Sequence, residues 1–338
     1  MIGWEEILHP DLPRDTVIHS WRGPKSLAEA ARKGYDGILS AGFYIDLSFP
    51  AWQHYTVEPA ASESNLNEQD LRHILGGEAT MWGEWVGPET IDSRIWPRTA
   101  AIAERLWSPR DVKDVDDMYR RLDAISIQLE ELGLTHEKNV DMLLRRMSGT
   151  ENIEPLKTLV SLVEPVKEYR RTQARPATML TPLTRFIDAA RPDSAAGRRF
   201  AALVDSLLSD PPYLARNRER IESTLRRWRD ASPMLEAIID KSPILREAEQ
   251  LPRDLSAIGT AGLEALSYVA ADVDPPAGWR QDKLAMLEQA AKPKAEVEFA
   301  IIAPVKTLVI LAAEFRSLKG IPHSQWRSRV LTLAKGPN

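Results

Sequence analysis

The chain contains no cysteine among its 338 residues. This absence excludes disulfide bonds, thiolate nucleophiles and cysteine-ligated metal sites. A long uninterrupted hydrophobic run is also lacking, because the longest, residues 299–315, contains Pro304, Lys306 and Glu314. We therefore expect a buried helix there rather than a membrane span. The N-terminus has no basic segment followed by an apolar one, so no signal peptide is recognised and the compartment stays unassigned.

An excess of positive over negative charge is lacking as well. The net charge is −5, with 10 basic and 16 acidic residues in 1–110 and 34 and 33 in 111–338. Neither region has the excess of Lys and Arg that binding to a phosphate backbone needs, so nucleic acid is not an expected partner. Arginines surround Trp228, but Glu219 and Glu222 stand among them, which favours a solvated helix face. The six histidines show no metal-ligand spacing, so no metal site is predicted.

Residues 1–110 alternate short strands with helices. Glu5 and Glu6 begin a short helix, where acidic residues suit the helix dipole without further purpose. The hydrophobic pattern and the Pro and Gly positions predict strands over 16–21, 37–40 and 75–82 and helices over 24–33 and 96–107. This alternation predicts a parallel sheet with right-handed crossovers.

From residue 111 to 338 the strand signals vanish. Apolar residues recur at spacings of three and four over 115–132, and Gly133 ends that helix. Further helical stretches are predicted over 138–148, 153–172, 182–209, 213–241, 244–272 and 281–318. The fold class predicted is therefore α/β in a domain at 1–110, followed by an all-α domain at 111–338.

Aromatic residues are concentrated at the predicted strand ends, since seven of the ten tryptophans lie in 1–110. In an α/β barrel the functional side chains sit where the strands end. Indoles there enclose an apolar group such as a sugar face, while a phenol and carboxylates bind hydroxyl and amide groups. The alternative is that strand-end tryptophans belong to the core. The side chains predicted to converge on one pocket are Trp4, Trp21, Tyr44, Asp46, Trp82 and Glu84.

Other residues near these positions are weaker candidates. His19 precedes Trp21 by two positions and shares its face of the strand, although a structural role is favoured over a catalytic one. Trp52, His54 and Tyr55 follow on the loop after the Tyr44 motif. Covering the pocket and packing against that loop are equally consistent with their positions.

Five motifs give the sequence a family resemblance. They are Ile2–Leu8 (IGWEEIL), His19–Trp21 (HSW), Leu39–Asp46 (LSAGFYID), Gly76–Glu84 (GGEATMWGE) and Trp96–Ser108, which begins WPR and ends AERLWS. At these residues the chain resembles the family-20 glycoside hydrolases, the β-N-acetylhexosaminidases. The resemblance implies that residues 1–110 are the C-terminal half of a TIM (β/α)8 barrel, about strands five to eight. More weakly, the helical remainder resembles the C-terminal extensions of some bacterial members.

The resemblance also implies roles for the site residues. The walls of the N-acetyl pocket would be Trp4, Trp21 and Trp82. The catalytic contribution of Tyr44 would be to align the acetamido group by donating its hydroxyl to the carbonyl oxygen, while Asp46 and Glu84 would hold the hydroxyls around O4 and O6. In this family the substrate's acetamido oxygen itself attacks the anomeric carbon, and an indole box favours that attack by proximity. The implied substrates are glycans ending in N-acetylhexosamine, with no cofactor, no metal and no membrane, and the implied parent enzyme is exported to the periplasm or medium.

The sequence departs from the family at the general acid. That acid is a glutamate preceded by an aspartate, and no Asp-Glu dipeptide occurs in the chain; Gly76-Gly77-Glu78 belongs to the last-strand motif instead. Because Met1 to Trp4 already read as a strand end, we expect a truncated form with little activity alone. Four parallel strands cannot close a barrel, so a missing N-terminal half or a second copy is the expected partner. The alternative is a non-catalytic sugar-binding or helical interaction protein derived from such an enzyme.

Overall fold

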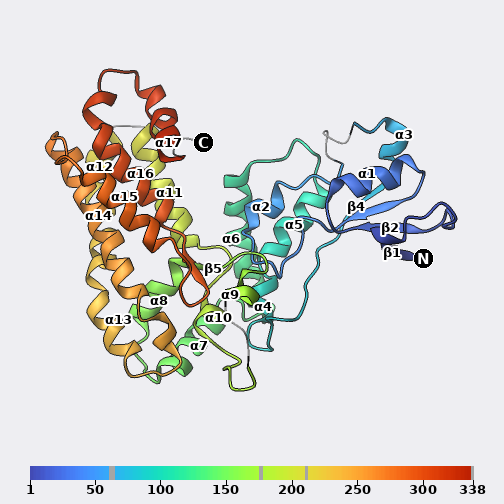
Figure 1. Ribbon diagram of the computed structural model, residues 1–338, viewed down its shortest axis with the longest axis horizontal. Helices are drawn as coiled ribbons and strands as arrows, with labels where there is room; N and C mark the ends of the chain where they lie inside the picture. Colours follow the sequence, from blue (N-terminus) through green and yellow to red (C-terminus); the bar gives the residue numbers. More distant parts are fainter. Residues whose placement is uncertain (61–64, 175–177, 210–211, 336–338) are drawn as a thin grey trace. The chain divides into compact units, whose positions relative to one another are not determined.

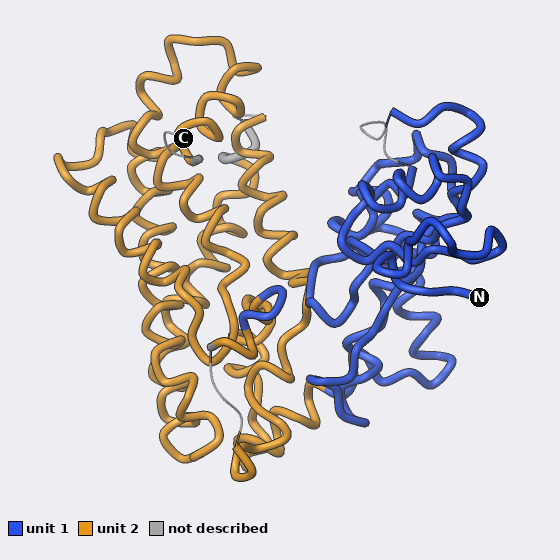
Figure 2. Tube along the Cα trace, turned by 45° about the vertical axis from the view of Figure 1, so that its right-hand side comes forward, with its two compact units in different colours: residues 1–139, 167–170 blue, residues 140–166, 171–338 orange. Residues whose placement is uncertain are grey.

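The computed structural model describes residues 1–60, 65–174, 178–209 and 212–335 (Figure 1). By its internal contacts the chain divides into two compact units, which Figure 2 shows in different colours. The first unit comprises residues 1–139 and 167–170, and the second comprises 140–166 and 171–338. Each unit buries apolar side chains of its own.

The first unit is built on a four-stranded parallel sheet whose strands follow chain order, β1-β2-β3-β4. The strands are β1 (Ile2–Trp4), β2 (Val17–Ser20), β3 (Gly37–Leu39) and β4 (Ile74–Gly77). The helices are η1 (Glu5–Ile7), α1 (Pro24–Arg32), α2 (Ala51–Tyr55), α3 (Glu68–Leu71), α4 (Ile91–Ile95), α5 (Arg98–Trp107) and α6 (Val115–Glu131). The structure thus has the parallel sheet that the alternating pattern predicts, while its place within a larger barrel stays a prediction.

Helix α1 shows how the sequence sets the local structure of this unit. Pro24 is in the first turn, where a missing N–H removes no intrahelical hydrogen bond. Gly34 follows the helix with a φ of 77°, a conformation that glycine adopts without strain. The apolar side chains of Leu27 and Ala30 are buried, and the helix contacts β2 and β3. The helix therefore covers one face of the sheet, and the loops at the strand ends remain available for a site.

The second unit is mainly helical. Its elements are α7 (Asn139–Ser148), α8 (Glu154–Ser161), β5 (Val163–Pro165), α9 (Arg170–Ala174), α10 (Phe186–Ala189), α11 (Ala195–Ser209), α12 (Pro212–Asp230), α13 (Ser232–Ile239), η3 (Leu245–Ala248), α14 (Leu251–Ala271), α15 (Trp279–Ala290), β6 (Val297–Phe299), α16 (Ile302–Leu318), η4 (His323–Gln325) and α17 (Trp326–Lys335). Helix α16, which contains most of the longest apolar run, is largely buried as predicted. Among the described residues, no helix meets the length and hydropathy needed to cross a membrane.

A two-stranded sheet corrects the all-helical prediction for residues 111–338. Strands β5 and β6 pair antiparallel, with Val163 opposite Phe299. The continuous helices predicted over 153–172 and 281–318 are therefore wrong at these positions. Each strand has only three residues, with a buried first and third position. Three residues are too few for alternating burial to be recognised as a strand, and the pairing partner lies far away in the sequence.

A buried network of ions ties several short elements of the second unit together. Glu296 accepts hydrogen bonds from the guanidinium groups of Arg171 and Arg185. Arg171 also binds Asp188, and Arg185 binds Glu247. These side chains are at most 12% exposed. Since a buried charge is tolerated only when it is paired, the network fixes the positions of α9, α10, η3 and the start of β6.

The domain boundary predicted at 110/111 differs from the division that the contacts give at 139/140. Helix α6 lies between the two positions and contacts α2 and α5 of the first unit. Its Arg121 bonds to Glu104 of α5, and its Met118 is buried together with Ala101. The contacts therefore place α6 in the same unit as the strands. The boundary at 110/111, drawn where the strand signals end in the sequence, stays a prediction.

The arginine-rich helix α12 packs closely against α14. Trp228 is 3% exposed and its ring meets Phe200 edge-on at 4.6 Å. The arginines face the other way into ion pairs, as Arg218 and Arg226 both bind Glu222. The solvated face predicted for this helix is confirmed for these residues.

Substituting Gly259 tests the packing of α14 on α12. An added Cβ would lie 2.7 Å from the backbone nitrogen of Arg229 and from the carbonyl oxygen of Leu225. Overpacking costs about 1–3 kcal/mol, against a gain of at most about 1 kcal/mol in helix propensity. Because backbone atoms cannot give way cheaply, we expect Gly259→Ala to lower the free energy of unfolding by about 1–2 kcal/mol, measured by urea titration of the helical circular dichroism.

Gly320→Ala is the matched control for that measurement. Its added Cβ would meet the carbonyl oxygen of Ser317 at 3.4 Å, an ordinary contact. We expect its unfolding free energy to stay within about 0.5 kcal/mol of the unsubstituted chain. Equal stability of the two variants would contradict the close approach of α12 and α14.

Candidate functional site

The parallel register brings the ends of the four strands to one edge of the sheet. Trp4 is opposite His19, Ser20 is opposite Leu39, and Leu39 is opposite Gly77. The residues that follow each strand therefore start from neighbouring positions. This edge is the one that carries functional side chains in α/β proteins.

The loops after β3 and β4 stay paired beyond the strands themselves. Tyr44 and Thr80 form an isolated parallel bridge. The amide of Ile45 donates to the carbonyl of Thr80 at 2.8 Å, and the amide of Thr80 donates to the carbonyl of Phe43 at 3.1 Å. Tyr44 and its neighbours therefore lie beside the segment that leads to Trp82.

Arg98 anchors the loop after β3. It is 2% exposed, and its guanidinium donates to the carbonyl oxygens of Ile45 at 2.9 Å and Phe49 at 2.7 Å. Arg98 belongs to α5, which packs on α2. A buried cation therefore fixes the loop on both sides of Asp46, so the carboxylate is held by rigid surroundings.

Tyr44 keeps its phenolic proton in this site. Its side chain is 8% exposed, and its hydroxyl lies 3.4 Å from the hydroxyl of Ser40. Burial raises the pKa of Tyr44, and the nearby charges of Asp46 and Glu5 raise it further. At neutral pH the hydroxyl is therefore a hydrogen-bond donor, suited to a carbonyl oxygen.

Asp46 links the two paired loops. Burial raises the pKa of its carboxyl, and so does the charge of Glu84, whereas the nearby backbone N–H of Trp82 lowers it. Its Oδ1 atom is buried and, among the described residues, has no hydrogen-bond partner. A buried acceptor without a partner is costly unless something binds it. The site thus presents an acceptor that a ligand hydroxyl would satisfy.

Three aromatic rings contact one another at this edge of the sheet. Trp4 stacks on His19 with ring centroids 4.3 Å apart and an interplanar angle of 22°. The ring of Trp82 lies 6.4 Å from that of Trp4 at 30°. Both indoles remain exposed, 39% for Trp4 and 47% for Trp82. Exposed indoles that contact each other form an apolar surface of the kind that a ligand covers.

Trp21 has different surroundings from the other two tryptophans. Its indole N–H donates to both carboxylate oxygens of Glu6, at 3.1 and 3.2 Å. The Arg22 guanidinium lies 4.6 Å from the centre of its ring. The described ring-to-ring contacts join Trp4 to His19 and Trp82 and do not include Trp21. The role of Trp21 as a wall of the pocket stays a prediction.

Glu5 and Glu6 were expected to serve only the helix dipole, and that expectation is wrong. The Glu5 side chain is 7% exposed and accepts hydrogen bonds from the hydroxyls of Ser20 and Ser26 and from the amide of Trp21. Together with the bonds of Glu6 to Trp21, these bonds fix the loop after β2. Partners fifteen or more residues away in the sequence could not be identified from the local pattern.

Two of the three aromatic side chains expected to cover the site from the loop after Asp46 are packed inside the protein instead. His54 and Tyr55 are fully buried, with Nδ1 of His54 2.7 Å from the carbonyl oxygen of Gly42 and the hydroxyl of Tyr55 donating to Glu104 at 2.7 Å. Trp52 is 46% exposed. Among the described residues, no group of three or more His, Asp or Glu side chains is arranged to hold a metal ion.

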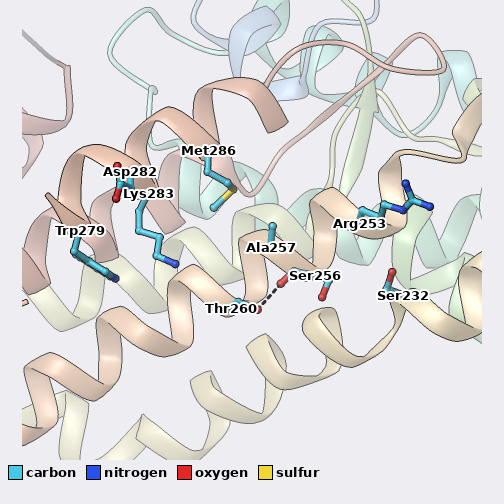
Figure 3. Close-up of a pocket in the computed structure, with 9 residues that line it drawn as sticks. All are labelled: Ser232, Arg253, Ser256, Ala257, Thr260, Trp279, Asp282, Lys283 and Met286. Atoms are coloured by element: carbon cyan, nitrogen blue, oxygen red, sulfur yellow. Dashed lines mark hydrogen bonds between the residues drawn. The ribbon is translucent and has the colours of Figure 1, made fainter. Parts of the chain in front are cut away.

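A separate hollow lies on the second unit, between α13, α14 and α15 (Figure 3). Trp279 and Lys283 both bind Glu264, at 2.7 and 2.8 Å. The hydroxyl of Thr260 is bonded to the carbonyl of Ser256. Within the described part of the chain, none of the residues lining this hollow has a buried polar atom without a partner. The edge of the sheet in the first unit is therefore the stronger candidate.

Known proteins match both parts of the chain. Residues 1–110 match the sequence model of the glycosyl hydrolase family 20 catalytic domain. The human beta-hexosaminidase subunit beta is 36% identical over 141 residues, covering 39% of this chain and 25% of that protein. The solved structure of a Flavobacterium johnsoniae chitobiase is 36% identical, with a TM-score of 0.82, and the match covers 91% of this chain and 47% of that one. The bovine subunit alpha is also 36% identical, over 142 residues.

These matches show that the chain is similar to glycoside hydrolases and indicate a TIM-barrel-related fold. In particular, residues 1–110 are similar to the catalytic domain of glycosyl hydrolase family 20. The resemblance stated from the sequence motifs is confirmed. The chain spans about a quarter of the length of the mammalian relatives and about half of the chitobiase.

Replacing Glu6 tests how Trp21 is held. Without the carboxylate, the indole N–H of Trp21 loses its acceptor, so in Glu6→Ala its resonance in a ¹H–¹⁵N spectrum is expected to shift and to exchange faster with water. The resonance is assigned by its loss in Trp21→Phe. Glu29→Ala is the control, because Glu29 pairs with Lys33 on α1. An unchanged Trp21 signal in Glu6→Ala would contradict the hydrogen bonds described.

Proposed function

We propose that the chain is a β-N-acetylhexosaminidase-type glycoside hydrolase in which the first unit binds a terminal N-acetylhexosamine. The observation that carries this proposal is the meeting of Trp4, Tyr44 and Asp46 with the Trp82 segment at one edge of the sheet. Indoles offer flat apolar faces, and the phenol and carboxylate offer a donor and an acceptor. The names of the matched hexosaminidases and chitobiase support the same ligand class.

In the proposed complex each group has a chemical task. The acetyl group lies against the exposed faces of Trp4 and Trp82. Tyr44, whose pKa is raised by burial, stays protonated and donates to the acetamido carbonyl oxygen. Asp46 accepts from a sugar hydroxyl through its unpaired Oδ1, and Glu84 binds a neighbouring hydroxyl. This arrangement holds the acetamido oxygen near the anomeric carbon for the substrate-assisted, retaining hydrolysis described for such enzymes.

The proposed chemistry needs a proton donor for the leaving oxygen. In the resembling family that donor is the Glu of an Asp-Glu pair, and no such pair occurs in these 338 residues. General acid catalysis contributes about two to four powers of ten in rate. We therefore propose that this chain supplies the sugar-binding residues and depends on a further segment for the acid.

The second candidate is a non-catalytic sugar-binding or helical interaction protein derived from such an enzyme. The well-formed core of the second unit supports an independent role for the helices. Both candidates predict a folded chain, but only the first joins sugar binding to turnover when the acid is supplied.

Sugar binding is the first test of the proposal. By calorimetric titration, the purified chain is expected to bind the thiazoline analogue of N-acetylglucosamine, and Trp82→Ala is expected to weaken that binding about tenfold or more, because it removes one indole face. Trp107→Ala is the matched control, since Trp107 is 93% exposed on α5 and outside the site. Absence of binding by the unsubstituted chain would refute a working sugar site.

Turnover is the second test. Alone, the chain is expected not to hydrolyse a chromogenic N-acetylglucosaminide above background, because the leaving oxygen lacks its acid. Joined to an upstream segment that carries a Gly-Gly-Asp-Glu motif, it is expected to hydrolyse that substrate, and Tyr44→Phe is expected to reduce the rate. Rapid turnover by the chain alone, lost in Tyr44→Phe, would show that another residue supplies the proton. A joined protein that binds sugar but stays inactive would favour the non-catalytic candidate.

A further inference from the structure

A short segment from far along the chain belongs to the first unit. Residues 167–170 are grouped with residues 1–139 by their contacts and share their colour in Figure 2. The amide of Glu168 donates to the carbonyl oxygen of Leu47 at 3.0 Å. Leu47 directly follows Asp46, the carboxylate at the centre of the candidate site. The segment therefore docks on the loop that positions Asp46.

The backbone of this segment is held in an uncommon conformation. Glu168 has a φ of 58°, in the left-handed region that residues other than glycine seldom adopt. Such a conformation is unfavourable and persists only where the surroundings determine it. The bond to Leu47 is one such determinant, and the next residue, Tyr169, is thereby fixed beside the site.

Tyr169 presents an aromatic ring that is mostly exposed. The side chain is 62% exposed, whereas Tyr44 in the same site is 8% exposed. Burial raises the pKa of Tyr44, and Tyr169 is among the nearby groups that raise it further. Because Glu168 is bonded to the residue after Asp46, the exposed ring of Tyr169 starts close to a buried donor and a buried acceptor, and it can contact a ligand that those two groups bind.

We propose that Tyr169 is a further sugar-contacting residue, whose ring stacks on the carbohydrate held by Tyr44 and Asp46. The proposal rests on the sugar-binding function proposed for this site. It assigns the segment 167–170 two tasks: Glu168 attaches it to Leu47, and Tyr169 adds an aromatic face. A sugar ring offers apolar C–H groups on one face and hydroxyls at its edge, so it uses such a face and the neighbouring carboxylate together.

Calorimetric titration with the thiazoline analogue of N-acetylglucosamine tests the role of the ring in the full chain. Removing the ring in Tyr169→Ala is expected to weaken binding about three- to tenfold, the effect of losing one aromatic contact. Tyr169→Leu keeps an apolar side chain but loses the flat face, and is expected to weaken binding similarly. Tyr169→Phe keeps the face and is expected to bind within about twofold of the unsubstituted chain.

Trp107→Ala again serves as the control for loss of an exposed ring in the same unit. Binding by Tyr169→Ala that equals binding by the unsubstituted chain would overturn the proposal for Tyr169 while leaving the sugar site intact. Binding by Tyr169→Phe as weak as by Tyr169→Ala would overturn the stacking role, since the ring would be present without effect. If the unsubstituted chain binds no sugar at all, both this proposal and the function on which it rests fail.

Discussion

The parallel register of β1 to β4 is the constraint on which the candidate site depends. It sets Trp4 level with His19 and Leu39 level with Gly77, so the loops after the strands start side by side. The bridge between Tyr44 and Thr80 continues that register beyond the strands. Without it, groups separated by about forty residues in the sequence, such as Tyr44 and the Trp82 segment, would have no reason to meet. The chemistry proposed for the site is therefore a consequence of backbone hydrogen bonds.

Exposed indoles and a partly buried carboxylate meet at this edge of the sheet, and one kind of ligand would account for both. The indoles of Trp4 and Trp82 stay exposed although they are apolar, while Asp46 is partly buried although it carries charge. Either arrangement is unfavourable for an empty protein, since apolar surface prefers burial and a carboxylate prefers water. A ligand with apolar C–H faces and hydroxyl groups would relieve both. The sugar proposed for this site is a ligand of that kind.

Much of the first unit was predictable from the sequence, because its signals are local. Pro24 and Gly34 mark the ends of α1, and the motifs place the aromatic residues near strand ends. The predicted strand over 75–82 is shorter in the structure, since β4 ends at Gly77 after Gly76 takes a φ of 134°. Contacts between distant residues were not predictable: the bonds of Glu6 to Trp21, the pairing of β5 with β6 and the docking of residues 167–170 have no local pattern.

The backbone pairing of the loop that carries Asp46 with the segment that leads to Trp82 has a consequence for how recognition can change. Because the two loops are bonded to each other, a substitution that moves the carboxylate of Asp46 also disturbs the segment that carries the indole of Trp82. New ligand preferences would then require compensating changes in both loops at once. Single-site libraries at Asp46 would report mostly loss, whereas paired libraries that vary both loops would sample altered selectivity.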